Sequence, residues 1–545
     1  MFNKIMRLFS RVNKSALAYS LFMTMPFTLV ISSILFAFGL SLNPLIYPIA
    51  VAFGALSVLF NSTLNIQDKK ITLVSYFCIW LTFLLMATLP IDWSWDGNTY
   101  RKSTILALSN GWSPFFDHHS LYEYHDRWVD HYARGLEILS STVFCSTGFI
   151  ESGKVYNLII VFCCLLFTND SLCHINFCLS KRKRLFYTIT MVMSPVVVGQ
   201  IFTYQTDFSM YCLLLIMVHE FLIIRDKIEW RQILVLSSCI ILLVSIKFNF
   251  AFWGGFLLLC VLILYVTRKK YHVAKQLFFI GCVSLVLGVL INYNPYFTNF
   301  IDHGTPFYPI FGSEECIPVD QNQMPQNYLS HSNFVNVLIS LFSHPQNNAY
   351  EATRLMFPFI FSPSDLLMLV DGNARAGGFG VWFSGFIILS ILLYLFTDMR
   401  KTDRIQSAVV LFLLFTSLFI LPVGWNARYV AFFYAFPFIA MLYCEKKSSK
   451  PYLRKLLYFV AVTNLVLTVL VVFAFACVYN VRNYKAIDIV KSKESPHLYF
   501  DGGTGFKHQI NERGISYIEI KDTTNNQNFE KAIDLKIHPK VFLFE

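Results

Sequence analysis

Repeated apolar runs are the feature that most restricts what this chain can fold into. A helix needs about 20 largely apolar residues to cross the hydrocarbon core of a bilayer, and about thirteen runs approach that length here. The runs are 16–40, 44–60, 71–91, 155–179, 185–202, 208–224, 233–246, 251–267, 277–291, 379–397, 406–421, 430–444 and 456–479. Only 14% of the 545 residues are charged, whereas a typical soluble protein has about 25%. The sequence therefore predicts an all-α polytopic membrane protein with about thirteen transmembrane helices.

Lysine and arginine gather in every second connection between these runs. The basic segments are 4–14, 69–70, 181–184, 225–231, 268–275, 400–404 and 446–455. Because short basic loops stay on the cytoplasmic side, we expect a cytoplasmic N-terminus and, with an odd number of spans, an external C-terminus. The net charge of +11 then reflects topology and gives no reason to expect a nucleic-acid partner.

This topology divides the chain into two parts. Residues 1–479 form a transmembrane core, whose long polar loops 92–154 and 292–378 are both external. Residues 480–545 are polar, and apolar and polar residues alternate around 498–501 and 515–520 with glycines between them. Such alternation is typical of strands. We expect a small external α/β module there, and we expect any chemistry on the same external face.

Two carboxylates stand at the start of the first external loop. Asp92 and Asp96 directly follow an apolar run, and Tyr100 comes four residues later. Burial near lipid raises the pKa of a carboxylate and makes it a competent general base. Asp96 is the stronger candidate for that role, whereas the aromatic residues around it also suit the interfacial belt of a membrane protein.

The same loop continues with a predicted amphipathic helix over 123–137 that lies on the membrane. At helical spacing Asp126, Asp130 and Arg134 share one face. This face is either solvated, or it lies opposite Asp96 across a cleft. Four histidines in this region make a divalent metal possible, although their spacing matches no metal motif: His118, His119, His125 and His131. No other cofactor motif is present.

Four charged residues, three of them cations, are expected at the external membrane face. Asp207 and Lys247 lie at the outer ends of two spans, and Arg375 and Arg428 directly precede two others. Arginine suits bidentate binding of phosphate. The alternative is that these cations form salt bridges with the loop carboxylates.

Taken in order, these segments resemble the bacterial polytopic glycosyltransferases of the GT-C fold. The matching series is Trp95, Asp96 and Tyr100; Asn110 and Gly111; Tyr132 and Gly135 to Glu137; Ser194, Pro195, Gln200, Thr206 and Asp207; Lys247 and Phe248; Asn294 to Tyr296, Asn299 and Gly304 to Pro309; Arg375 to Gly380; and Ala427 to Tyr429. The match spans roughly residues 91–444. The order of the pieces and their shared external placement make the resemblance specific.

The resemblance implies an inverting enzyme of the bacterial cytoplasmic (inner) membrane that acts on the external face. Its donor is a sugar on a polyprenyl phosphate, its acceptor is a cell-surface glycan or lipid, and Asp96 is the general base. The expected substrate-binding residues are Asp92, Tyr100, Asp126, Asp130, Asp207, Lys247, Tyr308, Arg375 and Arg428. No metal ligand is assigned.

Two features depart from the family pattern, and two other functions stay open. Ala133 and Arg134 stand where relatives often have proline, and Arg101 replaces a commoner histidine, which leaves the acceptor side open. An O-antigen-type polymerase or ligase also has many spans and a large external loop. A lipid or glycan transporter predicts charges buried midway through several spans, and the candidates for such charges are few.

Overall fold

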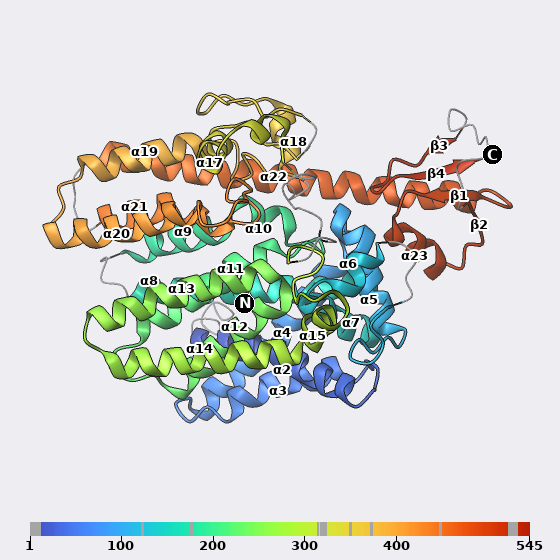
Figure 1. The fold of residues 1–545 in the computed structure, drawn as a ribbon, viewed down its shortest axis with the longest axis horizontal. Coiled ribbons are helices and arrows are strands. Elements are labelled where there is room, and N and C mark those ends of the chain that lie inside the picture. Colours follow the sequence, from blue (N-terminus) through green and yellow to red (C-terminus); the bar gives the residue numbers. More distant parts are fainter. Residues whose placement is uncertain are drawn as a thin grey trace.

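The computed structural model describes residues 12–120, 125–174, 179–312, 316, 324–347, 351–370, 374–445, 450–520 and 532–544. Most of them are helical, and the long helices run side by side in one bundle (Figure 1). Six helical segments in the described chain are long and apolar enough to cross a membrane. They are α2 (Lys14–Ala37), α4 (Ile66–Thr88), η2 with α8 (Ile150–His174), α13 (Phe248–Thr267), α14 (Tyr271–Ile291) and α22 (Pro451–Lys491).

The other predicted runs also form helices, but shorter ones. These are α3 (Ile46–Leu59), α9 (Lys181–Val192), α10 (Pro195–Gln200), α11 (Asp207–Ile223), α12 (Trp230–Ile246), α19 (Phe383–Phe396), α20 (Lys401–Ser417), η4 (Ala431–Ala435) and α21 (Phe436–Glu445). The prediction of a membrane protein built from apolar helices is confirmed, whereas thirteen helices of full spanning length are not found among the described residues.

One predicted span is wrong as a single helix. The run 185–202 is divided into α9 and α10, because Met193 leaves the helical conformation and Ser194 caps the next helix. The Ser194 hydroxyl accepts a hydrogen bond from the backbone N–H of Val197 at 3.3 Å. Pro195 occupies the first position of α10, where its missing N–H costs nothing.

The elements of the first predicted external loop gather at one end of the bundle. Figure 1 shows α5 (Lys102–Ser109), α6 (Asp126–His131) and α7 (Gly135–Thr147) at the right, beside α15 (Tyr293–His303). The basic connections after α13 and after α19 lie at the opposite end. Further short helices of the loop 292–378 are η3 (Gln326–Ser330), α17 (Asn333–Leu341) and α18 (Pro363–Met368). These two basic connections and the polar loops therefore lie at opposite ends of the bundle.

The predicted continuous helix over 123–137 is wrong. α6 ends at His131, Tyr132 is extended with a ψ of 152°, and α7 begins at Gly135. Arg134 at the break is buried, and its guanidinium donates to the backbone oxygen of Asp130. Burial of this side chain replaces the expected i,i+4 pair on a solvated face. Residues 123 and 124 lie outside the described residues.

Helix α22 connects the bundle to a small sheet. It has 41 residues and continues through residue 480 to Lys491, because it contains no glycine and its one proline stands at the first position. Four strands follow in the order β2-β1-β4-β3, namely β1 (His497–Phe500), β2 (Ile518–Glu519), β3 (Ile533–Asp534) and β4 (Val541–Phe544). β1 is parallel to β2 and antiparallel to β4, and β3 is antiparallel to β4.

The sheet packs on the end of α22. Ile487 and Val490 of the helix share one apolar cluster with Leu498 and Val541 of the strands. Helix α23 (Thr504–Glu512) connects β1 and β2 and lies against α5 and the π-helical turn η1 (Gly97–Arg101). We refer to α23, the four strands and the described segments that connect them as the C-terminal module.

Candidate active site

Four charged side chains from separate parts of the chain meet at the end of the bundle that carries the polar loops. The guanidinium of Arg428 donates to Asp207 through Nε at 2.6 Å and to Asp96 through one terminal nitrogen at 2.8 Å. The ammonium group of Lys247 lies 2.7 Å from the other oxygen of Asp207. The structure thus joins four of the predicted site residues in one ion-pair network.

The local structure explains how these groups reach the same place. Asp207 is the first residue of α11, where the helix dipole favours a negative charge. Lys247 is extended, with a φ of −164°, and separates α12 from α13. Arg428 lies just before η4, and Asp96 directly precedes the π-helical turn η1. Single-turn π-helices occur frequently at functional sites.

Asp96 differs from Asp207 in its access to solvent. The Asp207 side chain is fully buried, whereas 14% of the Asp96 side chain is exposed. Burial raises the pKa of Asp96, but the positive charges of Arg428 and Arg101 outweigh this effect and hold the pKa below its usual value. Asp96 is therefore a carboxylate that favours the ionised form and keeps part of its side chain exposed.

Arg101, which the sequence analysis did not include in the site, is a second buried cation near Asp96. It pairs with Glu137 of α7 and donates to the hydroxyl of Thr206 at 3.2 Å. A signal in the sequence was its position five residues after Asp96, in the loop that is predicted to be external. Its charge is one of those that lower the pKa of Asp96.

Asp92 belongs to a different cluster behind the same loop. Its carboxylate accepts hydrogen bonds from the backbone N–H groups of Ser94 at 2.8 Å and Tyr204 at 3.1 Å. Glu151 accepts from Lys102 and from Lys154, both at 2.6 Å, and also from the backbone of Asp92. Asp92 is fully buried, and its carboxylate is engaged by the chain's own groups.

A series of aromatic rings leads away from Asp96. The ring of Trp95 lies 6.4 Å from that of Tyr100, and Tyr100 lies 6.3 Å from Trp128 and 6.2 Å from Tyr132. Tyr132 in turn stacks on Phe248 at 5.8 Å. The predicted residue Tyr100 thus lies within an aromatic wall beside Asp96.

Asp130 and Tyr308 lie in a neighbouring cluster, and Asp126 is exposed. Asp130 accepts from the backbone of Ser120 at 2.9 Å. The ring of Tyr308 stacks on His303 at 3.6 Å, and its backbone oxygen accepts from the Asn299 side chain at 2.9 Å. Within the described ranges, Asp126, Asp130 and Tyr308 form no hydrogen bond or ion pair with Asp96, so the structure does not place the predicted polar face against Asp96.

The histidines do not form a metal centre in this part of the chain. Within the described ranges, no group of three or more His, Cys, Asp or Glu side chains is placed to hold a metal ion. His118 lies 2.8 Å from Asp302, and His131 lies 2.7 Å from Asn299. The idea of a divalent metal site at these histidines finds no support in their geometry.

Arg375 borders the network through its backbone. Its N–H donates to Gln346 at 2.9 Å, and its carbonyl oxygen accepts from the N–H of Ala427 at 2.8 Å. Since Ala427 is the residue before Arg428, the segment around Arg375 fixes the backbone that presents the Arg428 guanidinium.

A large apolar cavity opens beside the ion-pair network. Its volume is about 680 Å³, which is within the range of ligand pockets. The lining residues are Tyr132, Lys247, Phe248, Asn249, Ala251, Phe252, Phe307, Ile310, Phe311, Leu421, Pro422, Val423 and Tyr429. The Lys247 ammonium lies 4.6 Å from the centre of the Tyr429 ring. The cavity therefore combines a largely apolar wall with a cation that also contacts Asp207.

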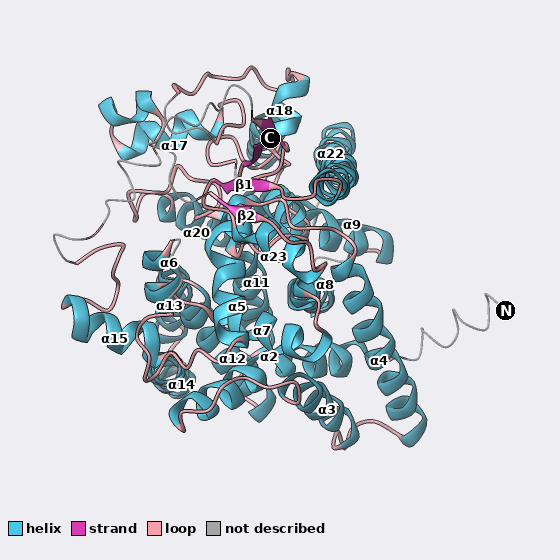
Figure 2. Ribbon diagram, turned by 90° about the vertical axis from the view of Figure 1, so that its right-hand side faces the viewer, coloured by secondary structure: helices cyan, strands magenta, loops and turns pink. Residues whose placement is uncertain are grey.

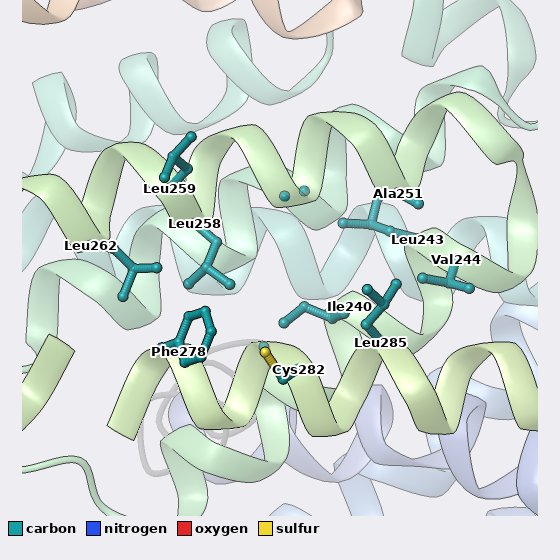
Figure 3. Close-up of a pocket in the computed structure, with 13 residues that line it drawn as sticks. Ile240, Leu243, Val244, Ala251, Leu258, Leu259, Leu262, Phe278, Cys282 and Leu285 are labelled. Atoms are coloured by element: carbon teal, nitrogen blue, oxygen red, sulfur yellow. The ribbon is translucent and has the colours of Figure 1, made fainter. Parts of the chain in front are cut away.

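A smaller cavity of about 220 Å³ lies between α12, α13 and α14. Figure 3 shows Leu258 and Leu262 pointing from α13 toward Phe278 and Cys282 of α14. Ala251 lines both cavities. The two cavities thus adjoin at Ala251 and form an apolar path along α13 that is exposed at Leu259 and Phe278.

Few known proteins resemble this chain in sequence or structure. No family model matches the chain, and no curated protein matches it. A solved structure to which it is similar is that of ArnT from Cupriavidus metallidurans in the apo state. The identity is 11%, the TM-score is 0.36, and the match covers 83% of this chain and 86% of that chain.

Proposed function

We propose that this protein is an integral membrane glycosyltransferase of the GT-C type, which transfers a sugar from a polyprenyl phosphate to a glycan or lipid acceptor. The observation that carries the proposal is the position of the 680 Å³ cavity, whose cation Lys247 belongs to the same ion-pair network as Asp96. The order of the sequence motifs gives independent support. The proposed location is the bacterial inner membrane, with the site on its external face.

The cavity suits an amphiphilic donor. Its apolar wall would take the first isoprene units, because burial of apolar surface contributes about 25 cal/mol per Å². Lys247 lies at the wall, and Arg428 lies on the other side of Asp207, so both cations can approach a phosphate. Cations in such a site stabilise the negative charge that develops on the leaving phosphate.

Asp96 is the proposed general base. The oxygen of an acceptor hydroxyl attacks the anomeric carbon of the donor sugar, and the proton of that hydroxyl moves to the Asp96 carboxylate. The bond between the anomeric carbon and the phosphate oxygen breaks, and the phosphate leaves with the electron pair. One displacement of this kind inverts the configuration at the anomeric carbon. A phosphate leaves without a proton donor, so a second catalytic carboxylate is not required.

Transfer by the purified protein tests this proposal. The protein in lipid nanodiscs is mixed with polyprenyl-phosphate sugars and candidate acceptors, and Asp96→Asn is assayed in parallel. We expect transfer by the parent and a loss of about 100-fold to 10,000-fold in the variant, the usual contribution of a general base. Full activity in Asp96→Asn would remove Asp96 from the base role. Movement of unchanged lipid across the membrane, without transfer, would favour a transporter, and extension of a lipid-linked polymer would favour a polymerase or ligase.

A further inference from the structure

The C-terminal module contacts the loop that carries Asp96. Thr504, the first residue of α23, donates through its hydroxyl to the carbonyl oxygen of Thr99 at 2.9 Å. The same hydroxyl lies 2.8 Å from the hydroxyl oxygen of Ser103. Figure 2, which looks toward the end of the bundle that carries the sheet, shows α23 among the strands in front of α5. Residues separated by about 400 positions therefore form one buried contact.

Gly505, the next residue, lies so close to the Asp96 loop that a side chain at this position would clash with it. A Cβ atom added at Gly505 would lie 2.1 Å from Oδ1 of Asn98, which is closer than real Cβ contacts come. Asn98 cannot easily give way, because its amide nitrogen donates to the backbone oxygens of Asp92 and Ser94 at 2.8 and 3.0 Å. Its Oδ1 also accepts from Lys102 at 2.9 Å. Pressure at Gly505 would therefore move the loop on which Asp96 lies.

A second glycine of the module contacts the same region from another side. A Cβ atom at Gly502 would lie 2.7 Å from Nε2 of His125. The His125 ring packs edge-on against Trp95 with the ring centres 5.4 Å apart. Since Trp95 is the residue before Asp96, the module borders the Asp96 loop at both Trp95 and Asn98.

We propose that the C-terminal module is a positioning element for Asp96, with Thr504 and Gly505 fixing the π-helical turn that follows this carboxylate. The inference rests on the proposed function, in which Asp96 is the base. It assigns the module a part in catalysis through the Asp96 loop, with no substrate contact of its own. The turn η1 starts directly after Asp96, so a shift of Asn98 or Thr99 alters the approach of Asp96 to Arg428 and to an acceptor hydroxyl.

Neighbouring glycines provide a matched pair of variants. Gly505→Ala presses on Asn98, whereas Gly503→Ala places its methyl group 3.2 Å from Pro539 of the module itself. Both substitutions add one methyl group, and the two positions flank Thr504. Thr504→Val removes the hydroxyl that donates to Thr99 while retaining the shape of the side chain, and Thr504→Ser restores the hydroxyl.

The experiment measures kcat, the KM for the lipid donor, and the pH dependence of kcat for all four variants in nanodiscs. Because a misplacement of about 1 Å can cost about 100-fold in rate, we expect Gly505→Ala and Thr504→Val to lower kcat by about 10-fold or more. The donor KM should change little, and Thr504→Ser should recover most of the activity. We expect Gly503→Ala to stay within about threefold of the parent.

The pH profile separates positioning from a loss of folded protein. If the Asp96 loop moves away from Arg428, the acidic limb of the profile shifts to higher pH, whereas partial unfolding lowers kcat at every pH without moving that limb. Equal kcat and pH profiles for Gly505→Ala and Gly503→Ala in an active protein overturn this inference and leave the proposed function standing. A parent protein without any transfer activity overturns both.

Discussion

Arg428 lies 2.8 Å from Asp96, although 332 positions separate the two residues in the chain. The same guanidinium reaches Asp207 through a different nitrogen at 2.6 Å. One planar group therefore fixes the distance between two carboxylates that come from different parts of the bundle. The candidate site exists only when the first polar loop, α11 and the segment before η4 have all assembled.

Replacement of Arg428 by lysine should show whether this bridge matters for activity. An ammonium group is a point charge, and it cannot reproduce the two separate contacts of the guanidinium. We expect Arg428→Lys to lower kcat/KM by about 30-fold to 100-fold, since each charge-assisted hydrogen bond contributes about 2 kcal/mol. The matched control is Arg400→Lys, because Arg400 pairs with Asp403 in a largely exposed position at the opposite end of the bundle. Equal losses in the two variants would show that the bridge has no role in transfer.

The pH dependence of transfer should follow the charges around Asp96. Arg428 and Arg101 outweigh the effect of burial and hold the pKa of Asp96 below its usual value, which is about 3.9 for an aspartate. The base therefore stays ionised at neutral pH, and its activity is lost only as the pH falls through this lowered pKa. We expect kcat to show no loss from Asp96 between about pH 8 and pH 5.

Removal of the Arg428 charge should shift this limit upward. In Arg428→Gln the positive charge that lowers the pKa of Asp96 most is lost, so this pKa rises and the acidic loss of kcat should begin at a higher pH than in the parent. The relevant measurement is the shape of the kcat profile, whatever the maximal rate of the variant. An unchanged acidic limb would contradict the assignment of Asp96 as the titrating base.

The helices were predictable from the sequence because a bilayer demands apolar runs of a certain length. The break at Tyr132 within the predicted helix 123–137 was not predictable, because it depends on the burial of Arg134, which is a tertiary contact. Likewise, the polar residues after 480 concealed a helical continuation. Tyr479, Ala486 and Val490 are buried at intervals that suit one helical face. This face is buried because the sheet packs on α22, which the sequence of the helix does not show.

The sequence analysis singled out the four charged residues of the ion-pair network but not their pairings. Asp96, Asp207, Lys247 and Arg428 each stand next to an apolar run, where a charge near the membrane surface suggests function. Their positions do not indicate that Arg428 contacts both carboxylates, because the contact depends on how distant helices pack. The buried cluster of Lys102, Glu151 and Lys154 was missed for the same reason.

That buried cluster should matter for stability. Glu151 accepts from Lys102 and Lys154, whose side chains are fully buried. In Glu151→Gln both ammonium groups lose their counter-charge, and removing one partner of a buried ion pair costs about 3–5 kcal/mol. We expect a clear fall of the unfolding temperature in detergent. Glu519→Gln is the control, because the Lys507–Glu519 pair is partly exposed and should contribute less than about 1 kcal/mol.

Filling the apolar path beside α13 should weaken the binding of long donors. Ala251 lines both cavities, so Ala251→Phe inserts a ring where the lipid chain is proposed to pass. We expect the KM for a long polyprenyl donor to rise about 10-fold, which corresponds to about 1.4 kcal/mol, and the KM for a donor with one or two isoprene units to change less. Ile263→Phe, at an exposed position of the same helix outside both cavities, is the control. An equal rise for both donors would contradict a lipid path at this place.

The unbroken length of α22 fixes the geometry between the bundle and the sheet. With a rise of 1.5 Å per residue, its 41 residues span about 60 Å, roughly twice the hydrocarbon thickness of a bilayer. The helix therefore acts as a rigid spacer that holds the sheet at one distance from the bundle and in one rotation about the helix axis. Because each added residue turns a helix by about 100°, a single insertion near Lys491 would rotate Thr504 away from the Asp96 loop, whereas a loop of the same length would absorb it.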